Sequence, residues 1–168
     1  MDTKTLLLEM NEKNREILKN TQNIIYQADN QENYIKRVDK NGITVHRTLS
    51  GVFVSSKSEV IIANALFEKG IPFQYDKRFD VLNENGGYYY PDFTIILPNG
   101  KIIYWEHFGL LSDKDYCKRT VEKIQFYFNN GICIGDNLII TVDDSEGNCS
   151  SPAIYGIIKE YLEPQFMF

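Results

Sequence analysis

The chain of 168 residues, 43% of them hydrophobic, is long enough for one well-packed domain with a short appendage but not for two full domains. Its net charge of −5 argues against tight, sequence-independent binding to nucleic acid, because such binding is largely electrostatic. Its three cysteines, Cys117, Cys133 and Cys149, are odd in number and show no C-x-x-C spacing, which argues against a disulfide framework and against a cysteine zinc site.

Two parts of the chain differ in character. Residues 1–50 are predicted to form an appendage made of a helix and a polar hairpin, and residues 51–168 a core domain. The first residues contain only a brief run of leucines with acidic residues close behind, so they predict neither a signal peptide nor a membrane span. A cytoplasmic protein in a reducing compartment, with no membrane partner, is expected.

Residues 3–27 predict a single helix, because apolar residues recur among Asn, Lys and Glu. Met10, Ile17 and Ile24 follow the seven-residue spacing of a coiled coil, but polar residues interrupt the partner seam. The ordinary interpretation is a helix that packs on its own domain. The alternative is a homodimer or another protein contact through this helix.

Basic side chains gather just ahead of the core domain, around a polar hairpin predicted with arms at residues 34–38 and 43–47. The stretch from Asp136 onward is instead acidic. Such basic runs are more often solvated loops, but they are also the kind of surface that contacts nucleic-acid phosphates. The candidates for this contact are Lys36, Arg37, Lys40, Arg47 and Lys57.

A second helix is predicted from Ser56 to Gly70. Ser56 and Glu59 fit an S-x-x-E capping box, and the apolar run behind them indicates a helix buried against a sheet. Residues 73–79 alternate in polarity and predict a half-exposed strand, after which residues 83–87 form the turn into the next hairpin.

The stretch from Tyr88 to Gly109 predicts a β-hairpin around the sequence Pro-Asn-Gly, and each arm carries one carboxylate in apolar company, Asp92 and Glu106. Proline and asparagine suit the two central positions of a type I turn, and the glycine suits the left-handed position of a three-residue loop. In that register Asp92 lies directly opposite Glu106 on one face, with Cβ atoms about 4.5–5.5 Å apart.

Two like charges so placed repel, so either water screens the pair or a cation lies between the two carboxylates. A hard divalent ion with oxygen ligands, Mg²⁺ or Mn²⁺, fits the spacing between Asp92 and Glu106. A two-residue Asn-Gly turn is the alternative. It would shift the register by one residue and turn the two carboxylates to opposite faces, where no joint site exists.

These residues carry a resemblance. Pro91-Asp92, an apolar strand, a turn and Glu106 on the next strand resemble the core motif of the PD-(D/E)XK, or restriction-endonuclease-like, nuclease superfamily, and the likeness in element order covers about residues 55–141. The resemblance implies an α-β-β-β-α-β core with a mixed sheet flanked by helices. It also implies a metal role for Glu59, because the first core helix of the family often carries a glutamate at the metal site.

The family's catalytic lysine normally stands two residues after the glutamate, where this sequence has Phe108. Several members of the superfamily place that lysine on the following helix, so the resemblance implies Lys123 as its replacement. The alternative for Lys123 is a long side chain that lies along an apolar surface. His107 points away from the carboxylate pair in the predicted register and is interpreted as a packed histidine, unless a bulge turns it toward the site.

The helix that carries Lys123 is predicted at residues 112–129, with Ser112 as its N-cap. Its core stripe is predicted as Cys117, Val121, Ile124 and Phe128, and the edge of that face as Tyr116, Thr120, Lys123 and Tyr127. A buried strand at residues 137–142 and a final helix at residues 153–162, ended by Pro164, complete the chain.

Three functions compete at this stage. The first is an Mg²⁺-dependent nuclease, with the metal on Asp92 and Glu106, Lys123 stabilising the transition state and Glu59 assisting. The second is a nuclease-like fold without catalysis that binds nucleic acid or protein. The third is an interaction protein that acts through its N-terminal helix. No residue separates DNA from RNA as the substrate.

Overall fold

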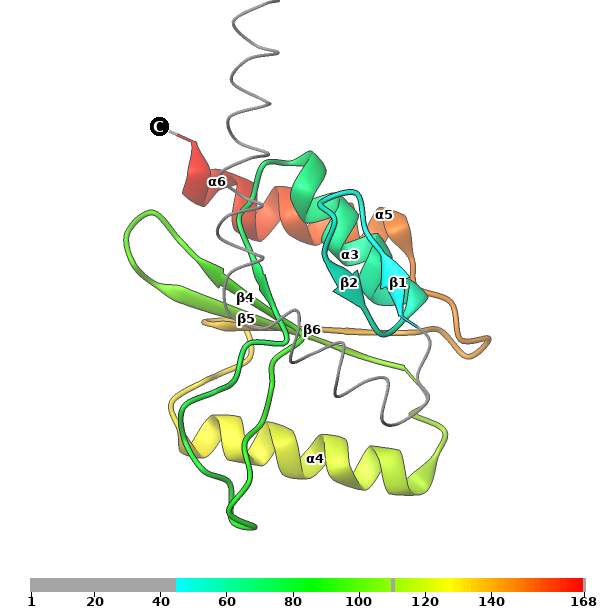
Figure 1. The fold of residues 1–168 in the computed structure, drawn as a ribbon, viewed down its shortest axis with the longest axis vertical. Coiled ribbons are helices and arrows are strands. Elements are labelled where there is room, and N and C mark those ends of the chain that lie inside the picture. Colours follow the sequence, from blue (N-terminus) through cyan, green and yellow to red (C-terminus); the bar gives the residue numbers. More distant parts are fainter. Residues whose placement is uncertain (1–44, 110, 168) are drawn as a thin grey trace, which may run out of the picture.

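The computed structural model describes residues 45–109 and 111–167, drawn in colour in Figure 1. The predicted N-terminal helix, most of the polar hairpin, and Lys36, Arg37 and Lys40 lie outside the described residues. Arg47 and Lys57, the two other basic candidates, are both exposed. Among the described helices, none is long and apolar enough to cross a membrane.

The described chain is a mixed α/β fold in three layers. Its sheet has the order β3-β4-β5-β6, with β3 (Gln74–Tyr75), β4 (Phe93–Ile96) and β5 (Ile102–Phe108) antiparallel and β6 (Leu138–Val142) parallel to β5. Helix α4 (Lys114–Asn129) lies on one face, and α3 (Lys57–Glu68) with α5 (Ser151–Ile157) covers the other (Figure 1). The element order α-β-β-β-α-β predicted from the sequence is therefore present.

Helix α3 begins where the sequence predicts. Ser56 accepts a hydrogen bond from the backbone N–H of Glu59, and the Glu59 carboxylate accepts one from the N–H of Ser56, so the capping box is formed. Just before this helix, the short strands β1 (His46–Arg47) and β2 (Phe53–Val54) pair in a separate antiparallel sheet. His46 of β1 is partly buried.

The strand predicted at residues 73–79 is wrong in its extent, because β3 ends at Tyr75. Asp76 follows in the left-handed region with φ of 51°, a conformation that interrupts a strand and that aspartate tolerates better than most residues. The N–H of Asp76 still donates to the carbonyl of Asp92 at 3.0 Å, and farther along the N–H of Phe79 donates to the carbonyl of Tyr89. The turn predicted at residues 83–87 is present, with the N–H of Asn83 donating to the carbonyl of Gly87.

The three-residue hairpin loop is confirmed. The N–H of Leu97 donates to the carbonyl of Lys101 at 2.8 Å, and Gly100 adopts the left-handed φ of 85° that the loop requires. Phe93 pairs with Trp105, so Asp92 stands opposite Glu106 as predicted. The alternative two-residue turn, with its shifted register, does not form.

Helix α4 presents a different face from the one that hydrophobicity favours. Val121 and Phe128, assigned to the core stripe, are 60% and 42% exposed, whereas Thr120 and Tyr127 of the edge stripe are buried. The assignment was wrong for Val121 and Phe128, while Cys117 and Ile124 are partly buried, because Lys123 and Tyr127 of this helix have a polar partner on the sheet in Glu106. Asp113 rather than Ser112 caps the helix.

The C-terminal part also departs from the prediction in detail. Only Leu138 of β6 is fully buried, because β6 is an edge strand with one neighbour. Helix α5 is followed by a π-helical turn at Ile158–Leu162 and by α6 (Glu163–Phe166). Pro164 therefore does not end the helical run. It lies in the first turn of α6, where proline is tolerated because a backbone N–H is not required at this position.

Two apolar cores fill the space on either side of the sheet. The larger lies between the sheet and the α3–α5 layer and includes Trp105, Phe93 and Ile62. The smaller lies under α4 and centres on Tyr127 and Leu138. Successive side chains of β5 alternate between these two cores, so the end of this strand can hold two chemically different groups back to back.

Candidate active site

The carboxylate pair forms the centre of the candidate site. Glu106, on β5, is 1% exposed, and Asp92, one residue before β4, is partly buried. Oδ2 of Asp92 accepts a hydrogen bond of 2.7 Å from the backbone N–H of His107. Because the hairpin register sets the two residues opposite each other, the loop at Pro98–Gly100 is what brings the carboxylates together.

Lys123 of α4 joins this pair from across the layer. Its Nζ lies 2.7 Å from Oε1 and 2.8 Å from Oε2 of Glu106, and it donates to the carbonyl of Tyr90 at 3.0 Å. The lysine side chain is only 18% exposed, so the ion pair is largely withdrawn from water. Asp92, Glu106 and Lys123, which are widely spaced in the sequence, are thus brought into one cluster.

Two tyrosines of α4 belong to the same cluster, and sequence reasoning missed them. The hydroxyl of Tyr127 donates to Oε1 of Glu106 at 2.5 Å, and its ring stacks on that of Tyr104. Burial raises the pKa of Tyr116, and the nearby charge of Asp92 raises that pKa further. The signal was present in the sequence, since both tyrosines share the helical stripe of Lys123 at spacings of four and seven residues.

The cluster holds two acids and one lysine, and the charges are unbalanced. Burial raises the pKa of Asp92 well above its usual value, and the neighbouring Glu106 raises it further, while Lys123 opposes both. Burial also raises the pKa of Glu106 against the opposing effect of Lys123. For Lys123, burial lowers the pKa, but Glu106 and Asp92 outweigh this and the net shift is upward. The lysine is therefore charged, and Asp92 is the group without a counter-charge.

Glu59 lies close to this cluster but is engaged elsewhere. It accepts hydrogen bonds from the N–H of Ser55 at 2.9 Å and from the hydroxyl of Tyr75 at 2.6 Å, in addition to its capping contacts. Its charge nevertheless raises the pKa of both Asp92 and Glu106. The capping interpretation is confirmed, and the metal role that the resemblance implies for Glu59 stays a prediction.

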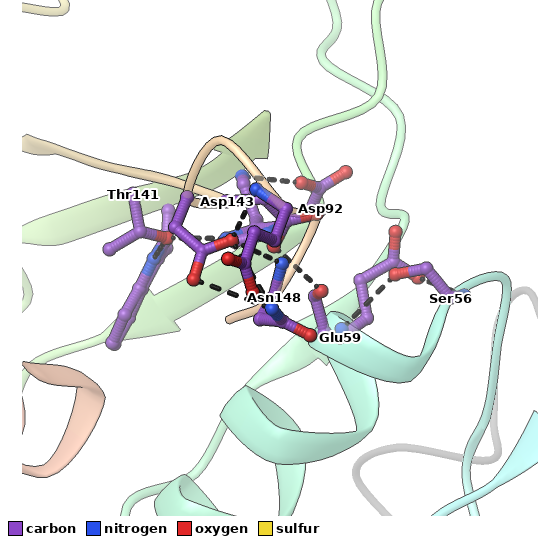
Figure 2. A network of polar contacts seen from close by, with 11 residues as sticks. Ser56, Glu59, Asp92, Thr141, Asp143 and Asn148 are labelled. Atoms are coloured by element: carbon purple, nitrogen blue, oxygen red, sulfur yellow. Dashed lines mark hydrogen bonds and ion pairs between the residues drawn. The ribbon is translucent and has the colours of Figure 1, made fainter. Parts of the chain in front are cut away.

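His107 lies on the opposite face from Glu106. Its Nδ1 is 2.9 Å from Oγ1 of Thr141, and its Nε2 is 2.8 Å from Oδ1 of Asp143. Strands β5 and β6 pair in regular register through Phe108, so no bulge turns His107 toward the carboxylate pair. Figure 2 shows this polar network, with Thr141 toward one end, Asp143 next to it, and Glu59 and Ser56 toward the other end at the start of α3.

Fold and site together define a class: a mixed α/β domain with a buried glutamate, a partly buried aspartate and a lysine on one face of its sheet. No family model matches the chain, and no solved structure matches it. Half of the chain, 85 residues, is 35% identical to a segment of Uncharacterized protein MJ1519 from Methanocaldococcus jannaschii. The chain spans 7% of the length of that relative, whose name describes no activity.

Proposed function

We propose that this chain is a metal-dependent nuclease of the restriction-endonuclease-like type, which hydrolyses phosphodiester bonds with Mg²⁺ or Mn²⁺ held by Asp92 and Glu106. The observation that carries the proposal is the ion pair of Lys123 with Glu106 at 2.7 Å, beside Asp92. The usual lysine position is taken by Phe108, which is buried, and a lysine from α4 lies against the carboxylates instead.

The donor set fits a hard divalent cation. The side chains that could hold the ion offer only carboxylate oxygens, which Mg²⁺ and Mn²⁺ prefer. A buried carboxylate that lacks a counter-charge is costly, and Asp92 is such a group once Lys123 is paired with Glu106. A bound Mg²⁺ would supply the missing charge, lower the pKa of a water molecule and polarise the attacked phosphate.

The chain's own residues divide the remaining work. Asp92 is held in place through the N–H of His107, and Glu106 through the hydroxyl of Tyr127. Both contacts fix the direction of the carboxylates before any ligand arrives. Lys123 presents a fixed positive charge beside them, which can stabilise the developing charge on the phosphate, a role worth several kcal/mol in a water-poor site.

Support also comes from the α-β-β-β-α-β order and from exposed Arg47 and Lys57 ahead of the core. The net charge of −5 limits how much non-specific affinity the chain can have for a polyanion. The substrate is nucleic acid, and the cleavage assay has to include DNA and RNA in single- and double-stranded form, because no described residue selects one of them.

The test is a cleavage assay with Mg²⁺ or Mn²⁺ on all four substrates. We expect Asp92→Asn and Glu106→Gln each to lower the cleavage rate by at least about 10²–10³-fold, as expected when a preorganised charged group is removed. Glu122→Gln, an exposed acid of α4 one residue from Lys123, is the matched control and should keep the wild-type rate. Full activity in Glu106→Gln would contradict the proposal.

A second candidate is a nuclease-like binding module without catalysis. One observation favours it: Lys123 already neutralises Glu106, so the fold can hold this carboxylate without a metal ion. Under this alternative the wild-type chain cleaves none of the substrates with either metal but still shifts a labelled duplex in a gel. Arg47→Gln and Lys57→Gln should then weaken that shift, whereas Asp92→Asn should leave it unchanged or strengthen it.

A further inference from the structure

A second group of metal-ligating side chains lies behind the carboxylate pair. His107 at the end of β5, Asp143 just after β6 and Cys149 before α5 each bring one ligand atom to the same place, and these three atoms lie within 4.8 Å of one another. The side chain of His107 is 4% exposed and that of Asp143 15% exposed. The three residues come from separate segments, so no short motif marks them in the sequence.

We infer that His107, Asp143 and Cys149 form a zinc site, with a water molecule in the fourth position. The donor set is one imidazole nitrogen, one carboxylate oxygen and one thiolate sulfur, a mixture that suits Zn²⁺ and not Mg²⁺. Around a tetrahedral zinc, with bonds of about 2.0–2.3 Å, the ligand atoms would lie about 3.4–3.7 Å apart. Nε2 of His107 and Oδ1 of Asp143 are now 2.8 Å apart and all three ligand atoms lie within 4.8 Å, so zinc binding requires shifts of about 1 Å.

The surroundings of Asp143 are built to hold its carboxylate at this point. Its backbone N–H donates to the carbonyl of Phe108 at 3.1 Å, and Oδ1 accepts from the hydroxyl of Ser58 at 3.0 Å. A Cβ atom on Gly109 would lie 3.3 Å from Oδ2 of Asp143, so the absence of a side chain there leaves room for the carboxylate. The end of β5 and the start of α3 thus fix the aspartate from two sides.

Thr141 supplies the contact that a zinc-bound histidine needs. A ligating histidine donates its other ring N–H to a fixed acceptor, which sets the ring orientation. If Nε2 of His107 binds zinc, Nδ1 carries the proton and donates to Oγ1 of Thr141, 2.9 Å away. Thr141 Oγ1 also accepts from the indole N–H of Trp105 at 2.9 Å, and a hydroxyl oxygen can accept both bonds.

Zinc at this point would fasten the segment after β6 to the end of β5. The turn between Asp143 and Cys149 is closed by hydrogen bonds in both directions between Asp144 and Asn148, the latter labelled in Figure 2. This turn brings the thiol of Cys149 back toward the carboxylate of Asp143. The inference does not depend on the proposed nuclease activity, because the ligands differ and the readout below is the thiolate–metal bond itself.

The test uses the full chain, stripped with EDTA and titrated with Co²⁺ as a spectroscopic substitute for Zn²⁺. We expect one thiolate-bound Co²⁺ per chain, seen as a thiolate-to-cobalt charge-transfer band, and loss of that band when Zn²⁺ is added. Cys149→Ser and His107→Gln should abolish the band. Cys133→Ser, which changes an exposed free cysteine, and Asp92→Asn should keep it.

Two further variants separate ligation from folding. Thr141→Val should weaken Zn²⁺ affinity about 10–100-fold, as measured by competition with a zinc indicator, whereas Thr141→Ser keeps the hydroxyl and should stay close to wild type. The inference is overturned if no charge-transfer band forms, if the band persists in Cys149→Ser, or if it disappears in Cys133→Ser. A band absent from wild type would leave His107, Asp143 and Ser58 as a hydrogen-bond network only.

Discussion

The two faces of the sheet at the end of β5 are chemically opposite, although the residues that define them are neighbours in the chain. Glu106 points to α4 and is met by a lysine and a tyrosine, whereas His107 points to the other layer and is met by an aspartate, a threonine and a nearby cysteine. The first face offers only oxygen atoms and a fixed positive charge. The second offers nitrogen, oxygen and sulfur.

The two faces also differ in how their polar side chains are stabilised when they are withdrawn from water. On the α4 face the groups are charged, so the arrangement depends on Lys123 and leaves Asp92 without a counter-charge. On the other face Oδ1 of Asp143 accepts a hydrogen bond from the hydroxyl of Ser58 and lies 2.8 Å from Nε2 of His107, so hydrogen bonds hold this network together in the absence of metal. Mg²⁺ is therefore expected to stabilise the first face, where it would supply the counter-charge that Asp92 lacks.

The two faces are also joined. The backbone N–H of His107 donates to Oδ2 of Asp92, so the residue that belongs to one face positions the carboxylate of the other. A shift of β5 by a fraction of an ångström would be felt in both clusters. This contact gives a structural reason to measure each face while the other is varied.

The largest expected effect is that of Lys123→Met, which keeps much of the side-chain volume and removes the charge. Glu106 and Asp92 would then be buried without a cation, and we expect the free energy of unfolding in EDTA to fall by about 3–5 kcal/mol. Urea denaturation at neutral pH measures this loss. Excess Mg²⁺ should restore part of it if an ion occupies the carboxylate pair.

The double variant Lys123→Met/Glu106→Gln is the control for that result. Because it removes both members of the ion pair, its loss should be clearly smaller than that of Lys123→Met alone. A loss below about 1 kcal/mol in the single variant would place this ion pair among ordinary surface pairs and remove the contrast between the two faces.

A smaller effect is expected from Asp92→Asn, and its sign depends on pH. Burial first and Glu106 second raise the pKa of Asp92 above 3.8 in the folded chain, so the folded state holds this proton more tightly than the unfolded state. The stabilisation of the folded state by this proton is fully present below the pKa of Asp92 in the unfolded chain. It is lost as the pH rises through the pKa of Asp92 in the folded chain. Asparagine cannot titrate and loses nothing over this range.

In EDTA, the free energy of unfolding of Asp92→Asn minus that of wild type should therefore increase from acid to neutral pH. At neutral pH the variant should be as stable as wild type or more so, since a carboxylate that repels Glu106 is gone. Urea unfolding at several values from about pH 4 to about pH 8 measures the difference. A difference that is flat or falls with pH would show that Asp92 is solvated and not buried beside Glu106.

The carboxylate pair could be predicted because local chemistry fixes its geometry. The turn at Pro98–Gly100 sets the register, and the register decides which side chains stand opposite each other. The capping box of Ser56 and Glu59 is local for the same reason. Wherever a few adjacent residues determine the backbone, the sequence was a sufficient guide.

The parts that could not be predicted depend on contacts between distant segments. Buried Glu106 determines which face of α4 turns inward, because its carboxylate requires Lys123 and Tyr127 as partners. The cost of leaving this carboxylate without partners outweighs the gain from burying Val121 and Phe128. His107, Asp143 and Cys149 meet only after β6 has paired with β5 and the chain has turned back. The spacing of Tyr116, Lys123 and Tyr127 marks them as one stripe of α4 but not as the stripe that turns inward, and no spacing brings the second group together.

The smallest expected effect is that of a glutamate at Val121. Compared with a glutamate at the neighbouring Thr120, it tests which face of α4 turns toward the sheet. Val121 is 60% exposed, so Val121→Glu should change the free energy of unfolding by no more than about 0.5 kcal/mol. Thr120 is 8% exposed on the face turned toward the carboxylates, and Thr120→Glu would add another buried acid there, at a loss of more than about 2 kcal/mol. Glutamate favours helix at both positions, so helix propensity cannot explain a difference between them. The opposite order, with Thr120→Glu tolerated and Val121→Glu destabilising, would mean that the apolar stripe faces the sheet, and then Lys123 would not reach Glu106.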